Sequence, residues 1–246
     1  MEGGIIMHST TFYIGAQTPA LSWATEYLKR NGLCVTEQPD STVTHLLLSI
    51  PTPEILLTDL PDGVTVIGGN LDDTLLPGHP KIDLLKDEGY LAENAAITAD
   101  CALRLAGSSL GIMFRGCPVL VIGWGRIGKC LAQQLGAMGA NVTIAARKEK
   151  DRAIAAALGY GVTDIANPTL SHYRLLFNTV PAPVLSAEQL RHCRQDCVKI
   201  DLASRRGLEG DGILWARGLP GKMLPETTGR LIGRTILRLI GKEAVS

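Results

Sequence analysis

The 246-residue sequence has no long apolar run, no excess of charge of either sign, and few aromatic residues. No apolar stretch approaches the ~20 residues that a helix needs to cross a bilayer. Lys plus Arg and Asp plus Glu number 24 each, so no net field attracts nucleic acid or an anionic membrane. The first ten residues, MEGGIIMHST, carry neither the basic nor the apolar segment of an export signal. We therefore expect a cytoplasmic protein that binds a small molecule.

The six cysteines include no C-x-x-C pair, and a chain of this length does not need disulfides to hold a core. We expect free thiols. His192, Cys193 and Cys197 stand close together, but a closed zinc site needs a second pair of ligands, so we predict no bound metal. Small buried residues beside a strand are the simpler explanation of the two cysteines.

Apolar β-rich runs alternate with amphipathic helical patterns along the whole chain, which predicts an α/β protein. The expected architecture is a Rossmann-type doubly wound parallel sheet with a smaller N-terminal α/β domain. A break at LPGHP precedes a long Ala-rich helix, expected from Lys81 to Leu105, that leads into the second domain. We place the substrate-side N-terminal domain at 1–92 and the dinucleotide-binding domain, with the final helix packed on its own sheet, at 93–246.

The stretch LVIGWGRIGKC, Leu120 to Cys130, predicts a dinucleotide site. A buried strand precedes Gly123, and an apolar helical stripe follows Gly128. In such a motif the first glycine makes the turn, Gly125 admits the pyrophosphate to the backbone, and the third lets the helix pack closely. The helix N-terminus then supplies free N–H groups for the phosphates. We expect the loop residues Trp124, Arg126 and Ile127 to line the same site.

The next strand ends in Ala145, Ala146, Arg147 and Lys148, without the acid that usually accepts the ribose hydroxyls of NAD. Two cations at this point suit a 2′-phosphate. The sequence therefore favours NADP, with NAD as the alternative if Arg147 only stacks on the adenine.

Three polar segments follow later strands, where parallel sheets bind ligands. FNTVPAP begins at Phe177, DLASRRG at Asp201 and ARGLPGKMLPETTG at Ala216. A polar turn after a buried strand is the alternative explanation of Asn178 and Thr179. The residues that we expect to contact the cofactor from these segments are Asn178, Thr179, Val180, Pro181, Asp201, Leu202, Ala203, Gly218, Leu219 and Pro220.

The candidate substrate residues are Ser204, Arg205, Asn94 and Thr98. A guanidinium holds a carboxylate through two parallel hydrogen bonds, so Arg205 suits an anionic substrate, although an exposed basic loop looks the same in sequence. Asn94 and Thr98 lie one helical turn apart, and a helix cap is the alternative role of Asn94. No histidine follows the last strand, which argues against a 2-hydroxyacid dehydrogenase.

Five strings carry a resemblance to a known family. They are YLAENAAITADCAL, VLVIGWGRIGKCLAQQLGAMGANVTIAARK, LLFNTVPAPVL, KIDLASRRGL and GLPGKMLPETTGRLI. Together, from about Gly68 to Ile240, they resemble the A subunit of dipicolinate synthase from spore-forming bacteria. The resemblance implies an NAD(P)-dependent oxidoreductase, in the cytoplasm of the mother cell, that makes pyridine-2,6-dicarboxylate from dihydrodipicolinate or a 4-hydroxytetrahydrodipicolinate. It also implies a partner, the flavoprotein-like B subunit of dipicolinate synthase, and leaves room for a homo-oligomer.

Two departures from the family pattern keep alternatives open. The N-terminal domain is shorter than usual, and Arg206 stands where a proline is common. One alternative is a non-catalytic NAD(P)-binding subunit that needs its flavoprotein partner. The other is a different Rossmann enzyme, such as a shikimate or amino-acid dehydrogenase.

Overall fold

The computed structural model describes residues 10–53 and 60–241, so the N-terminal segment assessed above as an export signal lies outside the described residues, apart from its last position. The chain divides into two compact units. One runs to Asn94 and resumes at Pro220, and the other is Ala95–Leu219. Within the described ranges, no helix combines the length and the apolar character needed to cross a bilayer.

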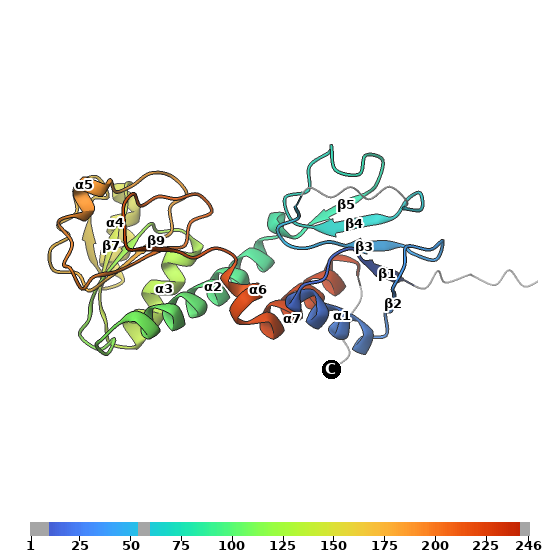
Figure 1. The fold of residues 1–246 in the computed structure, drawn as a ribbon, viewed down its shortest axis with the longest axis horizontal. Coiled ribbons are helices and arrows are strands. Elements are labelled where there is room, and N and C mark those ends of the chain that lie inside the picture. The colour runs from blue at the N-terminus through green and yellow to red at the C-terminus, as the bar shows by residue number, and fades with distance from the viewer. Residues whose placement is uncertain (1–9, 54–59, 242–246) are drawn as a thin grey trace, which may run out of the picture. The chain divides into compact units, whose positions relative to one another are not determined.

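The first unit contains a parallel sheet of five strands in the order β2-β1-β3-β4-β5 (Figure 1). Its central strands β3 and β4 contribute buried aliphatic residues, among them Leu46 and Val66, to one core. The strands are β1 (Thr11–Ile14), β2 (Cys34–Thr36), β3 (His45–Leu47), β4 (Thr65–Gly68) and β5 (Lys81–Asp83), and the helices are α1 (Pro19–Arg30), α6 (Leu219–Met223) and α7 (Pro225–Leu239).

Helix α7 packs against α1, and glycines make this close approach possible. A side chain at Gly229 would overlap the backbone oxygen of Ala20, and one at Gly233 would come within 2.6 Å of the Tyr27 ring. The apolar stripe of α7 is therefore buried on α1. This corrects the expected domain division, because the last helix belongs with the N-terminal unit rather than with the dinucleotide-binding one.

The long helix begins later than the expected Lys81. Residues Lys81–Asp83 form β5, a short 3-10 helix (η1, Leu84–Lys86) follows, and α2 spans Glu88–Ser109. Asp83 explains the early break, because its carboxylate accepts hydrogen bonds from the backbone N–H groups of Asn70 (3.1 Å) and Leu85 (2.9 Å). These bonds hold the end of β5 in place, and the bond from Leu85 caps the short 3-10 helix that begins there.

The second unit is built on a parallel sheet of six strands in the order β11-β10-β9-β6-β7-β8. The chain begins this sheet with β6, adds β7 and β8 toward one edge, and then returns to add β9, β10 and β11 toward the other edge. This is the doubly wound Rossmann order. The predicted fold class is thereby confirmed. The elements are β6 (Pro118–Ile122), α3 (Arg126–Ala137), β7 (Asn141–Ala145), α4 (Glu149–Ala157), β8 (Gly161–Thr163), β9 (Leu175–Asn178), α5 (Ala187–Leu190), β10 (Val198–Asp201) and β11 (Ile213–Trp215).

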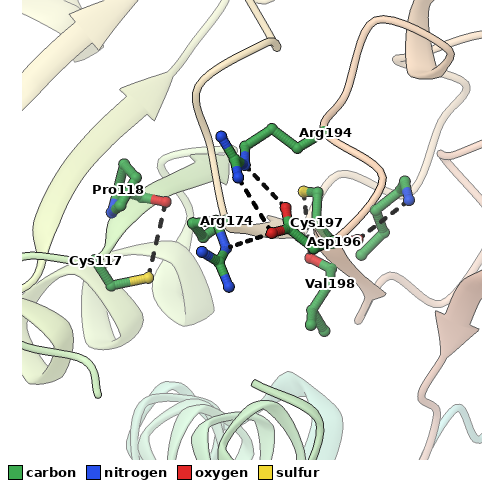
Figure 2. A network of polar contacts seen from close by, with 8 residues as sticks. Cys117, Pro118, Arg174, Arg194, Asp196, Cys197 and Val198 are labelled. Atoms are coloured by element: carbon green, nitrogen blue, oxygen red, sulfur yellow. Dashed lines mark hydrogen bonds and ion pairs between the residues drawn. The ribbon is translucent and has the colours of Figure 1, made fainter. Parts of the chain in front are cut away.

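A polar network joins the segments that lead into β9 and β10 (Figure 2). Asp196 pairs with Arg194 at 2.8 Å and with Arg174 at 3.5 Å. These residues precede their strands, so they lie at the amino ends of the sheet. Ligands of open α/β sheets bind at the opposite, carboxyl ends. We therefore interpret this network as structural.

Candidate functional site

The point where the strand order reverses lies between β6 and β9, which are neighbours in the sheet. Their register aligns Ile122 with Asn178, so the loops that follow the two strands start side by side. Open α/β sheets bind ligands in the crevice at this position. The glycine motif after β6 and the polar segment after β9 therefore meet at one place.

Gly123 adopts a conformation that favours glycine, with φ of 103°. Its N–H donates to the Ala145 oxygen at 2.9 Å. An added side chain would overlap the hydroxyl of Thr179 and come within 2.9 Å of the Val180 side chain. Thr179 in turn donates its backbone N–H and its hydroxyl to the Ile122 oxygen, each at 2.9 Å. Thr179 thus closes against the glycine turn, which ties β9 to β6.

Gly128 and Gly125 differ in what surrounds them. A side chain at Gly128 would overlap the Gly123 carbonyl oxygen, so α3 begins in contact with the turn. Gly125 precedes α3 with φ of −81°, no side chain caps the helix there, and nothing lies within 4 Å of an added Cβ. The start of α3 therefore has no side-chain cap and lies beside the open space at Gly125, and helix N-termini of this kind bind phosphates in other proteins.

The other residues of the glycine motif have different surroundings. Trp124 packs edge-to-face on Tyr160, with ring centroids 5.9 Å apart, and the Lys129 ammonium lies 5.9 Å from the Trp124 ring. Arg126 is exposed and Ile127 is half-buried. Trp124 therefore anchors the loop to the start of β8, a strand that the sequence patterns did not predict.

The backbone after β7 is held by Arg152, a residue that sequence reasoning missed. Its guanidinium donates to the oxygens of Ala146 (2.6 Å) and Arg147 (2.9 Å), and it pairs with Asp164 at 3.4 Å. Arg152 thus holds the backbone here, and the side chains of Arg147 and Lys148 are exposed beside the strand end. The pattern of a strand end followed by a helical arginine seven residues later was the available signal.

Asn178 and Asp201 are both fully buried, and they bond to each other. Asn178 Nδ2 donates to Asp201 Oδ1 at 2.9 Å and to the Val180 oxygen at 3.0 Å. Asp201 also accepts the N–H groups of Ala203 (3.1 Å), Gly207 (2.7 Å) and Leu208 (3.1 Å). The carboxylate thus accepts four hydrogen bonds, and three of them fix the backbone of the loop after β10. Contacts of these two side chains with a cofactor stay predictions.

Gly207 is a second residue that sequence reasoning missed. An added side chain would overlap the Asn178 amide and come within 2.7 Å of the Ala182 oxygen, so the loops after β9 and β10 touch at this glycine. Leu202 and Ala203 are buried in this contact, whereas Pro181 is exposed. The loop tip that remains exposed consists of Ser204, Arg205 and Arg206. Arg205 is therefore accessible to an anion.

The remaining predicted residues lie where the two units are divided. Asn94 ends the first part of one unit, and Thr98, only 8% exposed, lies one turn further along α2 in the other. Gly218 has φ of 63° and precedes α6, whose first residues Leu219 and Pro220 are buried. Substrate contacts of Asn94 and Thr98 and cofactor contacts of the segment at Gly218 stay predictions.

Two thiols near the start of β10 interact. A hydrogen bond with Cys197 lowers the pKa of Cys193 to about 7, and the same contact together with burial raises the pKa of Cys197. Within residues 10–53 and 60–241, no group of three or more His, Cys, Asp and Glu side chains is arranged to hold a metal ion.

The fold and the glycine turn define the class of the second unit: a Rossmann-type domain with a dinucleotide-type glycine motif. Residues 118–188 match the family model described as NADP oxidoreductase, coenzyme F420-dependent. These residues comprise the glycine motif, the strand end at Arg147 and the segment after β9.

The chain is homologous to the A subunit of dipicolinate synthase, which confirms the resemblance seen in the sequence. It is 28% identical to that protein of Bacillus subtilis (strain 168) over 171 residues, which are 65% of this chain and 58% of the relative. The match thus spans less than two thirds of the relative's length.

Two solved structures share the fold. The A subunit of dipicolinate synthase from Bacillus halodurans matches with a TM-score of 0.83 and 23% identity, covering 98% of this chain and 100% of the other. The A chain of dipicolinate synthase from Bacillus subtilis matches with a TM-score of 0.79 and 19% identity, covering 95% and 96%.

Proposed function

We propose that this chain is an NADP-dependent oxidoreductase that forms pyridine-2,6-dicarboxylate from dihydrodipicolinate. A 4-hydroxytetrahydrodipicolinate would first lose water to give the same dihydro compound. The observation that carries the proposal is the start of α3, which has no side-chain cap and lies beside open space at Gly125, in a chain homologous to the A subunit of dipicolinate synthase. The expected setting is the cytoplasm of a sporulating mother cell, and the expected partner is the flavoprotein-like B subunit.

The cofactor residues have separate tasks in this proposal. The N–H groups at the start of α3 bind the diphosphate, and the exposed Arg147 and Lys148 bind a 2′-phosphate. Thr179, fixed against the glycine turn, borders the position of the nicotinamide. When bound, the nicotinamide supplies the hydride acceptor.

The substrate loses a hydride and a proton, and the product ring is aromatic. Aromatisation supplies much of the driving force, so a weak base or solvent suffices for the proton. This fits the segments after β6, β9 and β10, which contain no histidine. Arg205 and Ser204, at the exposed loop tip, would hold one substrate carboxylate, and Asn94 and Thr98 would contact the substrate from α2.

Cofactor choice is tested by measuring the Kd of NADPH and of NADH. We expect tighter binding of NADPH, and Arg147→Ala should remove most of that preference because a charge-assisted contact to the 2′-phosphate is lost. Lys150→Ala is the matched control, since Lys150 is also exposed but is the second residue of α4 rather than part of the strand end. Equal Kd values for the two nucleotides, or an unchanged ratio in Arg147→Ala, would contradict the assignment.

Turnover tests the reaction itself. The purified chain is incubated with dihydrodipicolinate and NADP⁺, with and without the flavoprotein partner, and the absorbance of pyridine-2,6-dicarboxylate is followed. Product from the chain alone supports the proposal, and Arg205→Ala should then raise KM with little change in cofactor affinity. Absence of product under every condition, with nucleotide binding intact, would instead indicate a non-catalytic NAD(P)-binding subunit.

A further inference from the structure

A cluster of guanidinium groups and one indole lies at the carboxyl ends of β10 and β11. The two strands are parallel neighbours, and their register aligns Asp201 with Trp215. The loop that begins after Asp201 carries Arg205 and Arg206, and the segment after Trp215 carries Arg217. All of these residues belong to the six-stranded unit.

Trp215 is held in place by the loop and holds an arginine in turn. Its indole N–H donates to the Ala203 oxygen at 3.0 Å. The guanidinium carbon of Arg206 lies 4.8 Å from the centroid of the Trp215 ring, and that of Arg217 lies 5.2 Å away. The side chain of Trp215 is nevertheless 38% exposed. The guanidinium of Arg206 is therefore held beside the ring, and Arg206 remains exposed to solvent.

Positive charge at this loop tip is not neutralised by the protein. Among the described residues, neither Arg205 nor Arg206 forms an ion pair with an acidic side chain. The nearby carboxylate, that of Asp201, is buried and already accepts four hydrogen bonds. Guanidinium groups that gather beside one ring repel each other, so binding of an anion there is favoured.

Stacking also leaves the hydrogen-bonding groups of an arginine available. A guanidinium that lies over an aromatic ring keeps N–H donors at its rim, and these match a carboxylate bidentately. A side chain that is already oriented loses less conformational freedom when it binds. Arg206 should therefore lose less conformational entropy on binding a carboxylate than a freely moving surface arginine would.

We propose that Arg206, held against Trp215, binds the second carboxylate of a dicarboxylate substrate whose first carboxylate binds Arg205. This inference rests on the proposed function and deepens it by naming a residue through which this chain would distinguish a dicarboxylate from a monocarboxylate. Trp215 acts as a positioning residue through Arg206.

The test measures binding of two probes to the full chain by calorimetry, without cofactor, partner protein or metal ions. The probes are pyridine-2,6-dicarboxylate and pyridine-2-carboxylate. We expect the dicarboxylate to bind at least about tenfold more tightly, since a second charge-assisted contact is formed. Arg206→Ala should remove this preference and leave the Kd of the monocarboxylate unchanged, whereas Arg205→Ala should weaken both probes.

Further variants separate positioning from folding. Trp215→Leu should lower the preference, and Trp215→Phe should restore most of it because an aromatic face remains. Arg191→Ala, at another exposed arginine of the same unit, is the control and should change neither Kd. Thermal unfolding of each variant checks that the fold is intact.

Three results would overturn the inference: no preference for the dicarboxylate, no binding of either probe at millimolar concentration, or equal effects of Arg206→Ala on both probes. The proposed function is judged separately by NADPH binding and by turnover. A failure of the inference and a failure of the proposed function are therefore distinguishable.

Discussion

The Gly125→Ala variant tests whether the glycine motif binds a phosphate or only forms a turn. The backbone there has φ of −81°, which alanine adopts easily, and nothing lies within 4 Å of the new methyl group. The methyl group would, however, occupy the space in front of the α3 N-terminus where a diphosphate must lie. We therefore expect the variant to fold normally and to bind NADPH poorly.

The expected changes in NADPH affinity and in stability both follow from this geometry. Loss of one charge-assisted hydrogen bond costs about 1.5 to 3 kcal/mol, which is about 10- to 150-fold in Kd. Stability changes little, because restricting the unfolded chain stabilises by about 0.4 to 1 kcal/mol while alanine is a poorer helix N-cap than glycine. A net change within about 1 kcal/mol corresponds to at most about 4 °C in Tm.

The assay is a fluorescence titration with NADPH beside a thermal unfolding curve, with and without the nucleotide. Gly111→Ala is the matched control, since an added methyl group there also meets nothing within 4 Å but lies in the loop after α2. It should leave Kd and Tm unchanged. If Gly125→Ala bound NADPH as tightly as the unaltered chain, the assignment of the phosphate cradle would be refuted.

Gly128→Ala gives the contrasting outcome. Its methyl group would overlap the Gly123 carbonyl oxygen, so α3 must move away from the turn. This variant should lose both stability and nucleotide binding. A variant with intact Tm would show that the helix tolerates a shift at this contact.

Three further predictions concern other parts of the chain. Asp201→Asn should lower the free energy of unfolding by at least about 2 kcal/mol, because an amide NH₂ would face two N–H donors; an unchanged urea midpoint would contradict this. Cys193 should be alkylated half-maximally near pH 7, its lowered pKa, while Cys130, whose pKa is raised by burial, reacts only at higher pH; mass spectrometry of the two peptides compares them. Asp87→Ala should destabilise by about 1 kcal/mol at pH 7, since Asp87 accepts from the Tyr90 N–H at the start of α2 and from Arg238, each at 2.7 Å. These partners lower the pKa of Asp87, so its stabilisation is complete above the unfolded pKa of about 3.9 and disappears at more acidic pH, where the two proteins should converge.

Local patterns were sufficient for most of the second unit. The strand before Gly123 and the helix after it follow from apolar periodicity, and the glycine spacing reflects steric needs that act over a few residues. The strands β2, β5 and β8 were not recognised, because each is three residues long and none lies in a longer apolar run. Their formation depends on pairing with β1, β4 and β7.

Residue roles were less predictable than elements. Asn178 and Asp201 were expected to contact a cofactor, yet their side chains bond to each other across neighbouring strands that are 23 positions apart in sequence. The stacking of Arg206 on Trp215 likewise joins two segments that only the sheet brings together. No spacing rule covers such pairs.

By itself, the sequence determined that parallel α/β layers form and that a glycine turn precedes a helix, because both depend on periodicity and on contacts within a few residues. Only the tertiary structure decided that the last helix packs on the first, that a buried carboxylate organises the loop after β10, and which arginine is oriented by an indole. These features depend on contacts between segments far apart in the chain, and such contacts exist only once the sheets have assembled.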